Sequence, residues 1–308
     1  MQTVYWRRRA IAIGGVAVLA GIAVLVARGC GADDEPAATR GAATPPPPAQ
    51  LPGGGRRILP GHRVVAAYGA PQDRELGTLG IGTPAEAGQR LLKTADDYKL
   101  WGPVLPAMEL IAVIADGAPG DSGLYRTRQT DKVIRRYLRA ARKVDALLIL
   151  DIQPGRSDFL REAMALKRWL REPDVSLALD PEWRVSAPNV PGQVIGSVSA
   201  REVNAVSYWL AALVHERDLP QKLLLLHRFT SGMIDDPAAL KRRPGLAIAI
   251  NVDGFGGQAV KRAKYREMAG QNPGFANGFK LFYEEDSGLL KPRQVMHLKP
   301  RPEVVVYE

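Results

Sequence analysis

The chain has one cysteine, Cys30, and none of the short motifs that mark the commonest nucleotide and acyl-transfer sites. A single thiol cannot form a disulfide within a monomer, so the core alone has to hold the fold. There is no Gly-x-Ser-x-Gly elbow, no phosphate-binding loop and no cysteine pair at metal-ligand spacing. These absences argue against an elbow-type serine hydrolase, a P-loop nucleotidase and a cysteine-ligated metal site.

Acidic residues are the scarcer charge, with 32 Asp and Glu against 42 Lys and Arg and a formal net charge of +10. Part of the excess lies in Arg7, Arg8 and Arg9, and the rest is spread along the sequence. No basic helical pattern is interleaved with aromatic residues. This distribution predicts a surface with a mild preference for anionic polymers or lipid head groups, and it predicts no nucleic-acid partner.

Residues 1–30 have the composition of a membrane-targeting segment. The three arginines precede an uncharged run from Ala10 to Ala27, which is at the short end for a spanning helix. The arginines place the N-terminus in the cytoplasm and the remainder of the chain on the other side. Two interpretations stay open: a signal anchor that remains in the cell membrane, or a lipoprotein signal cut before a lipidated Cys30. Either one predicts a folded domain on the extracytoplasmic side.

Residues 31–60 are low in complexity, with four consecutive prolines and the run Pro52 to Gly55. Such a composition cannot bury a core, so we expect a disordered spacer. Residues 61–308 remain as one folded domain of roughly 245 residues, a size that suits an α/β barrel. The composition, 46% apolar and 24% charged, is that of an ordinary globular protein.

Apolar runs alternate with amphipathic helical patterns through the predicted domain. They predict eight strands, at residues 63–68, 108–115, 146–152, 175–180, 193–198, 222–227, 246–252 and 278–283. Capping boxes at Thr83–Glu86 and Ser199–Glu202 begin two of the intervening helices. The fold class is therefore α/β, a (β/α)8 TIM-like barrel after a membrane segment and a Pro/Gly-rich linker.

Two points of the fold stay open. The alternative architecture is an open doubly wound sheet, but that fold needs a glycine-rich loop after its first strand, and Gly69-Ala70-Pro71 is not one. Residues 303–307 form a ninth apolar run, which is either a flanking strand or the last stave of the barrel.

The stretch from Leu177 to Trp183 is the expected fourth strand and its carboxyl end. Side chains alternate across a strand, so Asp180 and Glu182 are expected on the inner side with Ala178, while Leu177 and Leu179 face the helices. Barrel enzymes hold their sites at such ends. The strand ends together give candidate catalytic carboxylates Glu182, Asp180, Asp253 and Asp151, and candidate substrate-binding residues Tyr68, Trp183, His227, Gln153, Asn251 and Tyr283.

Asp180-Pro181-Glu182-Trp183 at a fourth strand end resembles the glycoside hydrolase superfamily of TIM barrels. That resemblance implies that Glu182 is the general acid, that Asp180 orients or stabilises, and that Asp253 or Asp151 is the second carboxylate acting on a cell-envelope polysaccharide. It implies no cofactor and no metal. The first strand lacks the aspartate of the lysozyme-type members. The whole chain also resembles membrane-tethered secreted proteins of high-GC actinobacteria, a likeness that implies no mechanism.

Two other functions remain open at this point. One is a barrel that binds an envelope glycan or protein without turnover, which the missing first-strand aspartate favours. The other is a metal-dependent phosphodiesterase, suggested by His227-Arg228 with Asp151. A structural alternative applies to the single aspartates too, because Asp180 and Asp253 precede Pro and Gly and suit turns.

Overall fold

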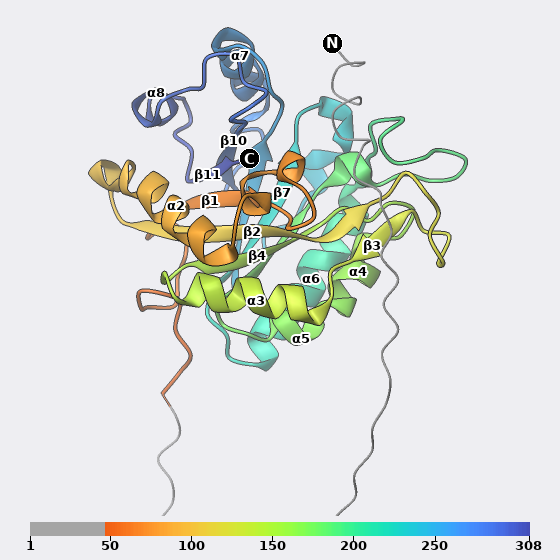
Figure 1. Cartoon of the computed structure of the whole chain (residues 1–308), viewed down its shortest axis with the longest axis horizontal. Coiled ribbons are helices and arrows are strands. Elements are labelled where there is room, and N and C mark those ends of the chain that lie inside the picture. The colour runs from red at the N-terminus through yellow and green to blue at the C-terminus, as the bar shows by residue number, and fades with distance from the viewer. Residues whose placement is uncertain (1–46) are drawn as a thin grey trace, which may run out of the picture.

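The computed structural model describes residues 47–308, which form a closed α/β barrel (Figure 1). Neighbouring strands pair in parallel all the way round, and the last strand pairs with the first. The eight staves are β1 (Arg63–Gly69), β2 (Val104–Ala115), β4 (Leu147–Ile152), β5 (Val175–Leu179), β7 (Lys222–Arg228), β9 (Leu246–Val252), β10 (Ala276–Leu281) and β11 (Val304–Tyr307). The predicted TIM-like barrel is confirmed, and the open sheet is excluded.

The fifth predicted strand, residues 193–198, is wrong. Only β6 (Val198–Ser199) is extended, and it pairs with β8 (Ile234–Asp235) in a separate two-stranded sheet. The segment packs instead on the loop after β5, where Gly196 N donates to Glu182 O at 2.6 Å. The ninth apolar run takes the vacant place in the barrel, because β11 lies between β10 and β1.

Helices cover the outside of the barrel, and several begin where the sequence predicts. Thr83 and Glu86 form the predicted capping box, and the Ser199 side chain accepts from Glu202 N. The helices are α2 (Pro84–Asp96), α3 (Asp131–Arg142), α4 (Phe159–Ala165), α5 (Lys167–Leu170), α6 (Ala200–Glu216), α7 (Gln258–Met268) and α8 (Pro292–Met296). Short 3-10 turns are η1 (Arg74–Leu76), η2 (Thr78–Gly80), η3 (Lys99–Trp101), η4 (Pro181–Trp183), η5 (Ser231–Met233) and η6 (Pro237–Ala239), and β3 (Arg126–Arg128) pairs antiparallel to the end of β2.

Strand β5 shows how the alternation divides the core. Leu177 and Leu179 pack outward among the helices, and Ala178 packs inside the barrel, as predicted. The strand ends at Leu179, however, and Pro181 begins η4. Asp180 and Glu182 therefore do not belong to one strand, and the prediction that strand alternation places them together is wrong.

The amino-terminal end of the barrel is closed by residues that come before β1. Leu51, Ile58 and Leu59 are buried in the same core cluster as the interior side chains of the strands. Gln221 Oε1 accepts hydrogen bonds from Ile58 N and Leu59 N at 2.7 and 3.0 Å. The folded body therefore begins before residue 61 and takes in the end of the predicted linker, and the core formed by the described residues starts at Leu51.

The predicted targeting segment, residues 1–30, lies outside the described residues. Among residues 47–308, no helix is both long enough and apolar enough to cross a membrane.

Candidate metal centre

Polar side chains replace apolar ones inside the barrel near the carboxyl ends of the strands. Glu109 of β2, Asp151 of β4 and His227 of β7 point inward and are fully buried, with 0% exposure. Nearer the amino ends the same inward positions carry apolar residues such as Leu147 and Leu223. A buried charge costs free energy unless it has a partner or a ligand. The change from apolar to charged side chains therefore marks the interior near the carboxyl ends of the strands as a candidate site.

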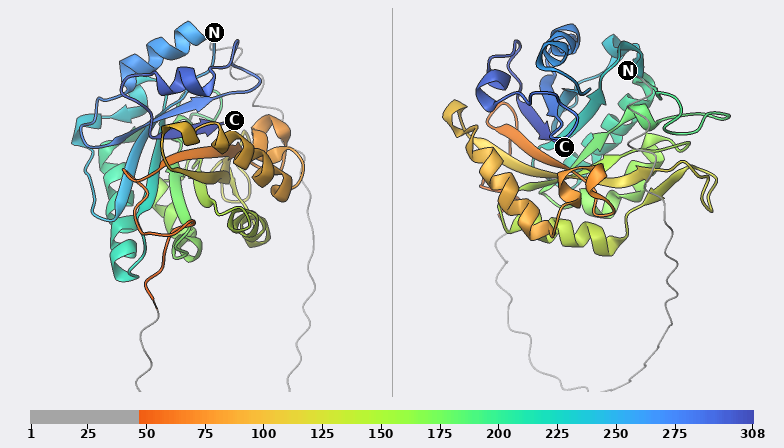
Figure 2. Two further views of the ribbon diagram at one scale, coloured as in Figure 1. Left: turned by 90° about the vertical axis from the view of Figure 1, so that its left-hand side faces the viewer. Right: turned by 45° about the horizontal axis from the view of Figure 1, so that its top comes forward.

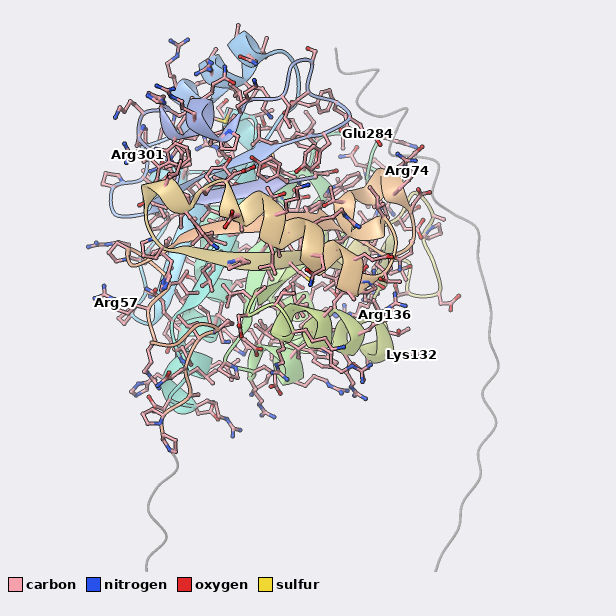
Figure 3. All side chains as sticks on the ribbon, turned by 60° about the vertical axis from the view of Figure 1, so that its left-hand side comes forward. Arg57, Arg74, Lys132, Arg136, Glu284 and Arg301 are labelled. Carbon is pink, nitrogen blue, oxygen red and sulfur yellow. The ribbon has the colours of Figure 1, made fainter. Side chains whose placement is uncertain are left out.

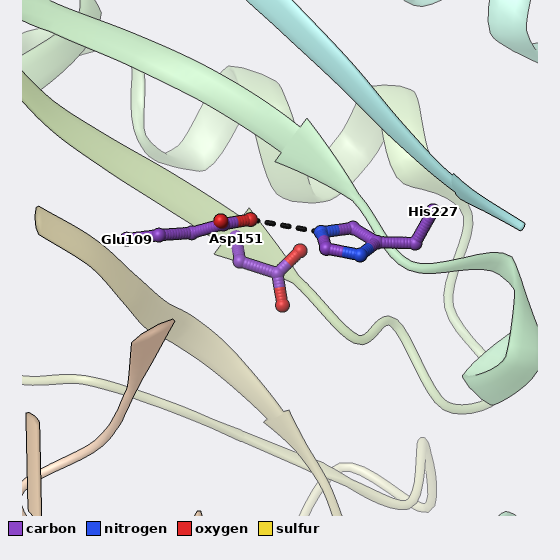
Figure 4. A group of neighbouring side chains, drawn as sticks. All are labelled: Glu109, Asp151 and His227. Atoms are coloured by element: carbon purple, nitrogen blue, oxygen red, sulfur yellow. Dashed lines mark hydrogen bonds and ion pairs between the residues drawn. The ribbon is translucent and has the colours of Figure 1, made fainter. Parts of the chain in front are cut away.

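His227 lies between the carboxylates of Glu109 and Asp253, and Figure 4 shows its hydrogen bond to Glu109. Its Nε2 is 2.8 Å from Glu109 Oε1, and its Nδ1 is 2.7 Å from Asp253 Oδ2. Burial disfavours the charged ring, but the charges of Asp253 and Glu109 outweigh burial and raise the pKa of His227 well above its usual value. Asn251 Nδ2 donates to Asp253 Oδ1 at 2.6 Å and fixes that carboxylate. The imidazolium therefore holds one proton toward each acid.

Asp151 completes the group from the neighbouring strand. Tyr68 Oη donates to Asp151 Oδ2 at 3.1 Å, and Gln153 Nε2 donates to Tyr68 Oη at 3.1 Å. Burial raises the pKa of Asp151 to about 7, although the charge of His227 opposes that rise. Among the described residues, none hydrogen-bonds to Asp151 Oδ1 or to Glu109 Oε2.

The Asp180–Trp183 turn lies at the same end of the barrel, in the loop after β5. Asp180 is 2% exposed and Glu182 is 3% exposed, and Trp183 is also buried. Burial raises the pKa of Asp180 well above its usual value, and the charge of Glu182 adds to this effect. Within the described part of the chain, Asp180 Oδ2 has no hydrogen-bond partner.

Lys280 of β10 brings a positive charge to the other side of the interior. Its Nζ is 2.8 Å from Glu308 Oε2, 3.7 Å from Asp253 Oδ2 and 3.6 Å from the centroid of the Tyr68 ring. Together with His227 it is a cation close to buried acids, among them Glu109, Asp151, Asp253 and Glu308.

Sequence reasoning missed Glu109, Lys280 and Glu308. The strand-end criterion passes over Glu109 because it lies within β2, which has a bulge between Ile111 and Val113 and continues past the barrel to pair with β3. The available signal was a lone charged residue inside an apolar strand, as in MELIAVIA and GFKLFY. A lone charged residue in a barrel strand faces the interior and needs a partner there.

Most of the predicted site residues lie at this end of the barrel, but Tyr283 does not join the group. Tyr283 is 46% exposed and stacks on Tyr307, with the ring centroids 5.3 Å apart. It lines a cavity of about 680 Å³ beside α2, together with residues that include Leu91 and Glu308. Tyr68, Gln153, His227 and Asn251 do contact one another or the acids.

Glu109, Asp151 and His227 have the arrangement of a metal-ligand set. One ligand atom from each lies within 4.8 Å of the others. Two carboxylates and an imidazole suit divalent ions such as Mn²⁺, Fe²⁺ or Zn²⁺. Asp253 behind His227 Nδ1 is the carboxylate that commonly orients a metal-bound histidine. The chain is thus a closed α/β barrel with a buried Glu–Asp–His group at the carboxyl ends of its strands.

Comparisons with known proteins give a fold likeness only. No family model and no curated protein sequence matches the chain. Among solved structures, the chain is similar to 5-methylcytosine deaminase from Klebsiella pneumoniae liganded with 5-fluorocytosine, at 12% identity and a TM-score of 0.31. The match covers 74% of this chain and 53% of that one, so the chain spans about half the length of the deaminase chain. A likeness at this level carries no argument about chemistry.

The predicted sugar-cleaving function is wrong. A glycosidase needs two carboxyl groups open to a scissile bond between them. Here Asp253 is bound to His227 and Asn251, and Asp151 belongs to the Glu109–His227 group. Asp180 and Glu182 are buried. The structure assembles a candidate cation site, which was absent from that prediction, in place of a pair of carboxylates facing a groove.

Proposed function

We propose that the chain is a hydrolase that uses a divalent cation held by Glu109, Asp151 and His227. One observation carries the proposal: two fully buried carboxyl oxygens, Glu109 Oε2 and Asp151 Oδ1, have no partner among the described residues and belong to a group with His227. A buried carboxylate oxygen left without a partner costs free energy, and a cation would remove that cost.

The surroundings of His227 suit such an ion. With a cation on Nε2, the ring keeps its Nδ1 proton on Asp253, and Asn251 holds that carboxylate in place. The cation would lower the pKa of a bound water and so supply a nucleophile at neutral pH. Asp180 provides a further buried carboxyl with an oxygen that no described residue contacts, and it is our candidate for carrying a proton.

The balance of charge supports a neutral or cationic substrate. The cations beside the Glu109–Asp151–His227 group, His227 and Lys280, already lie against carboxylates. A phosphodiester brings negative charge and would find neither of these cations unpaired. This argues against the phosphodiesterase alternative and favours attack on a neutral carbonyl or amidine carbon.

Calorimetry of residues 47–308, stripped with a chelator and titrated with Zn²⁺ or Mn²⁺, tests the cation site. We expect one ion per chain and the release of a proton, because His227 must give up its Nε2 proton to bind metal. Glu109→Gln should remove most of the affinity. Asp253→Asn should weaken binding by about 10–100-fold, as is usual when the group that orients a metal-bound histidine is lost.

Asp121→Asn is the matched control, because Asp121 is an exposed acid away from the barrel interior. It should bind the ions like the wild type. If Glu109→Gln binds them equally well, the assigned ligands are wrong. Turnover of neutral amides and amidines by the loaded protein, with a phosphodiester for comparison, then tests the reaction. Binding without turnover of any of these would overturn the hydrolase proposal and leave the ion site standing.

We also propose that the domain is tethered outside the cytoplasm. Support comes from Arg7–Arg9 and the uncharged run Ala10–Ala27 in the sequence. Protease treatment of intact cells, followed by fractionation, should degrade the domain and leave in the membrane a fragment that begins at residue 1 or, for a lipoprotein, at the lipidated Cys30. A domain protected until the cells are lysed would contradict the proposal.

A further inference from the structure

Folding gathers basic residues that looked spread along the sequence onto one side of the barrel. Helices α3 and α5 carry five and two basic residues, against a single acid, Asp131. They lie side by side, because Asp131 pairs with Arg168 and the Arg135 guanidinium lies 5.8 Å from the centroid of the Trp169 ring. We call this surface the basic face; its residues are Lys132, Arg135, Arg136, Arg139, Arg142, Lys167 and Arg168.

Most charges of the basic face are not neutralised by the protein. Lys132, Arg136 and Arg139 are exposed, and no ion pair within the described chain uses them. Figure 3 shows Lys132 and Arg136 pointing out of α3 to the same side. Arg142 is different, since it pairs with Glu172 and Asp174. Like charges this close repel one another, and a partner with dense negative charge would relieve that repulsion.

The path of the chain favours a membrane as that partner. Residues 47–55 leave the barrel on the side where α3 and α5 lie (Figures 1 and 2). Chain from Ala27 to Pro47 spans at most about 70 Å, so a membrane segment ending at Ala27 would keep this side close to the lipid. Tethering also raises the effective concentration of a weak surface contact.

We propose that the basic face docks on anionic phospholipid head groups. Each Lys or Arg near an anionic bilayer changes partition by about fivefold. Replacing three exposed residues should therefore weaken binding at least tenfold, even if each is only partly effective. The contact would also weaken as salt rises, because exposed charges are screened over about 10 Å at moderate ionic strength.

Vesicle co-sedimentation of residues 47–308 tests the proposal. Phosphatidylcholine vesicles with and without phosphatidylglycerol are compared at equal total lipid. The wild type should sediment only with phosphatidylglycerol present. The variant Lys132→Gln/Arg136→Gln/Arg139→Gln should lose that binding. The matched control, Arg266→Gln/Arg293→Gln/Arg301→Gln, removes the same charge from α7, α8 and the loop after α8 and should keep it.

Circular dichroism is the control for folding, and we expect both triple variants to be folded because the substituted positions are exposed. Equal loss in the two variants would show a general effect of net charge and overturn the proposal. The proposal is also overturned if the wild type does not sediment with vesicles that contain phosphatidylglycerol. If soluble polyphosphate at the same phosphate concentration binds more tightly than the vesicles, the partner is an anionic polymer and the lipid assignment fails.

Discussion

Lys222 at the start of β7 should make the stability of the barrel rise with pH. Its side chain is fully buried, and Nζ donates to Glu172 O and Val175 O at 2.8 and 2.6 Å. Burial lowers the pKa of Lys222 to about 7, although Asp174 and Glu172 oppose that change. The unfolded chain keeps a lysine pKa of about 10.4. Between these two values the unfolded state binds a proton that the folded state does not, so stability increases with pH.

The magnitude follows from the two pKa values. Below about pH 7 Lys222 is protonated in both the folded and the unfolded state, and the buried charge destabilises the fold in full. Above that pH the folded protein loses the proton, and this destabilisation decreases. Linkage gives a gain of about 2 kcal/mol in the free energy of unfolding between about pH 7 and about pH 9. Urea unfolding of the wild type and of Lys222→Met over this range measures it, because other titrating groups cancel in the difference.

Lys222→Met should also show an offset that does not depend on pH. Methionine cannot donate to the two carbonyls. Glu172 O keeps its hydrogen bond from Val175 N at 3.3 Å, whereas loss of the donor to the buried Val175 O costs about 1–3 kcal/mol. The two stability curves should therefore diverge as pH rises, with the wild type gaining. Parallel curves would refute the argument that the folded protein holds this lysine neutral at alkaline pH.

Three further substitutions test the interior and the loop after β5. His227→Ala should destabilise the fold by about 3–5 kcal/mol in urea, because it leaves Glu109 and Asp253 buried without their shared cation; a loss below about 1 kcal/mol would contradict the ion-pair geometry. Tyr68→Phe removes the hydroxyl that donates to Asp151 Oδ2 and should raise the pKa of Asp151 further. In an NMR titration the midpoint of the Asp151 carboxyl signal should move to higher pH. An unchanged midpoint would argue against that hydrogen bond. Gly196→Ala would place a Cβ 2.4 Å from Arg184 O. We therefore expect the free energy of unfolding, measured by heat or urea, to fall by about 2–4 kcal/mol. An unchanged free energy would show that the loop can move to admit the methyl group.

The alternation of apolar residues was enough to predict the barrel. In β5, Leu177 and Leu179 turned outward and Ala178 inward, as period two requires. The alternation could not decide whether residues 193–198 or residues 303–307 form a strand of the barrel, because both are short apolar runs. The structure separates them by their contacts. Gly196 packs on the loop after β5, and β11 lies between β10 and β1. Long-range packing of that kind leaves no local signal.

Reading strand ends found some of the residues that lie together in the barrel interior, but it missed Glu109. Asp151, His227 and Asp253 were chosen because they end strands, and they do lie together. Glu109 lies within a strand, and its distance from His227 depends on strand pairing around the barrel and on the bulge in β2. Without Glu109 the acids looked like a pair for sugar cleavage. With it, the histidine acquires a carboxylate on each ring nitrogen.

The burial of Leu51, Ile58 and Leu59 also fixes where the preceding chain joins the barrel. These residues cap one end of the barrel, and the Glu109–Asp151–His227 group occupies the other. The chain before Leu51 therefore joins the folded body at one end of the barrel, and the candidate metal centre lies at the opposite end.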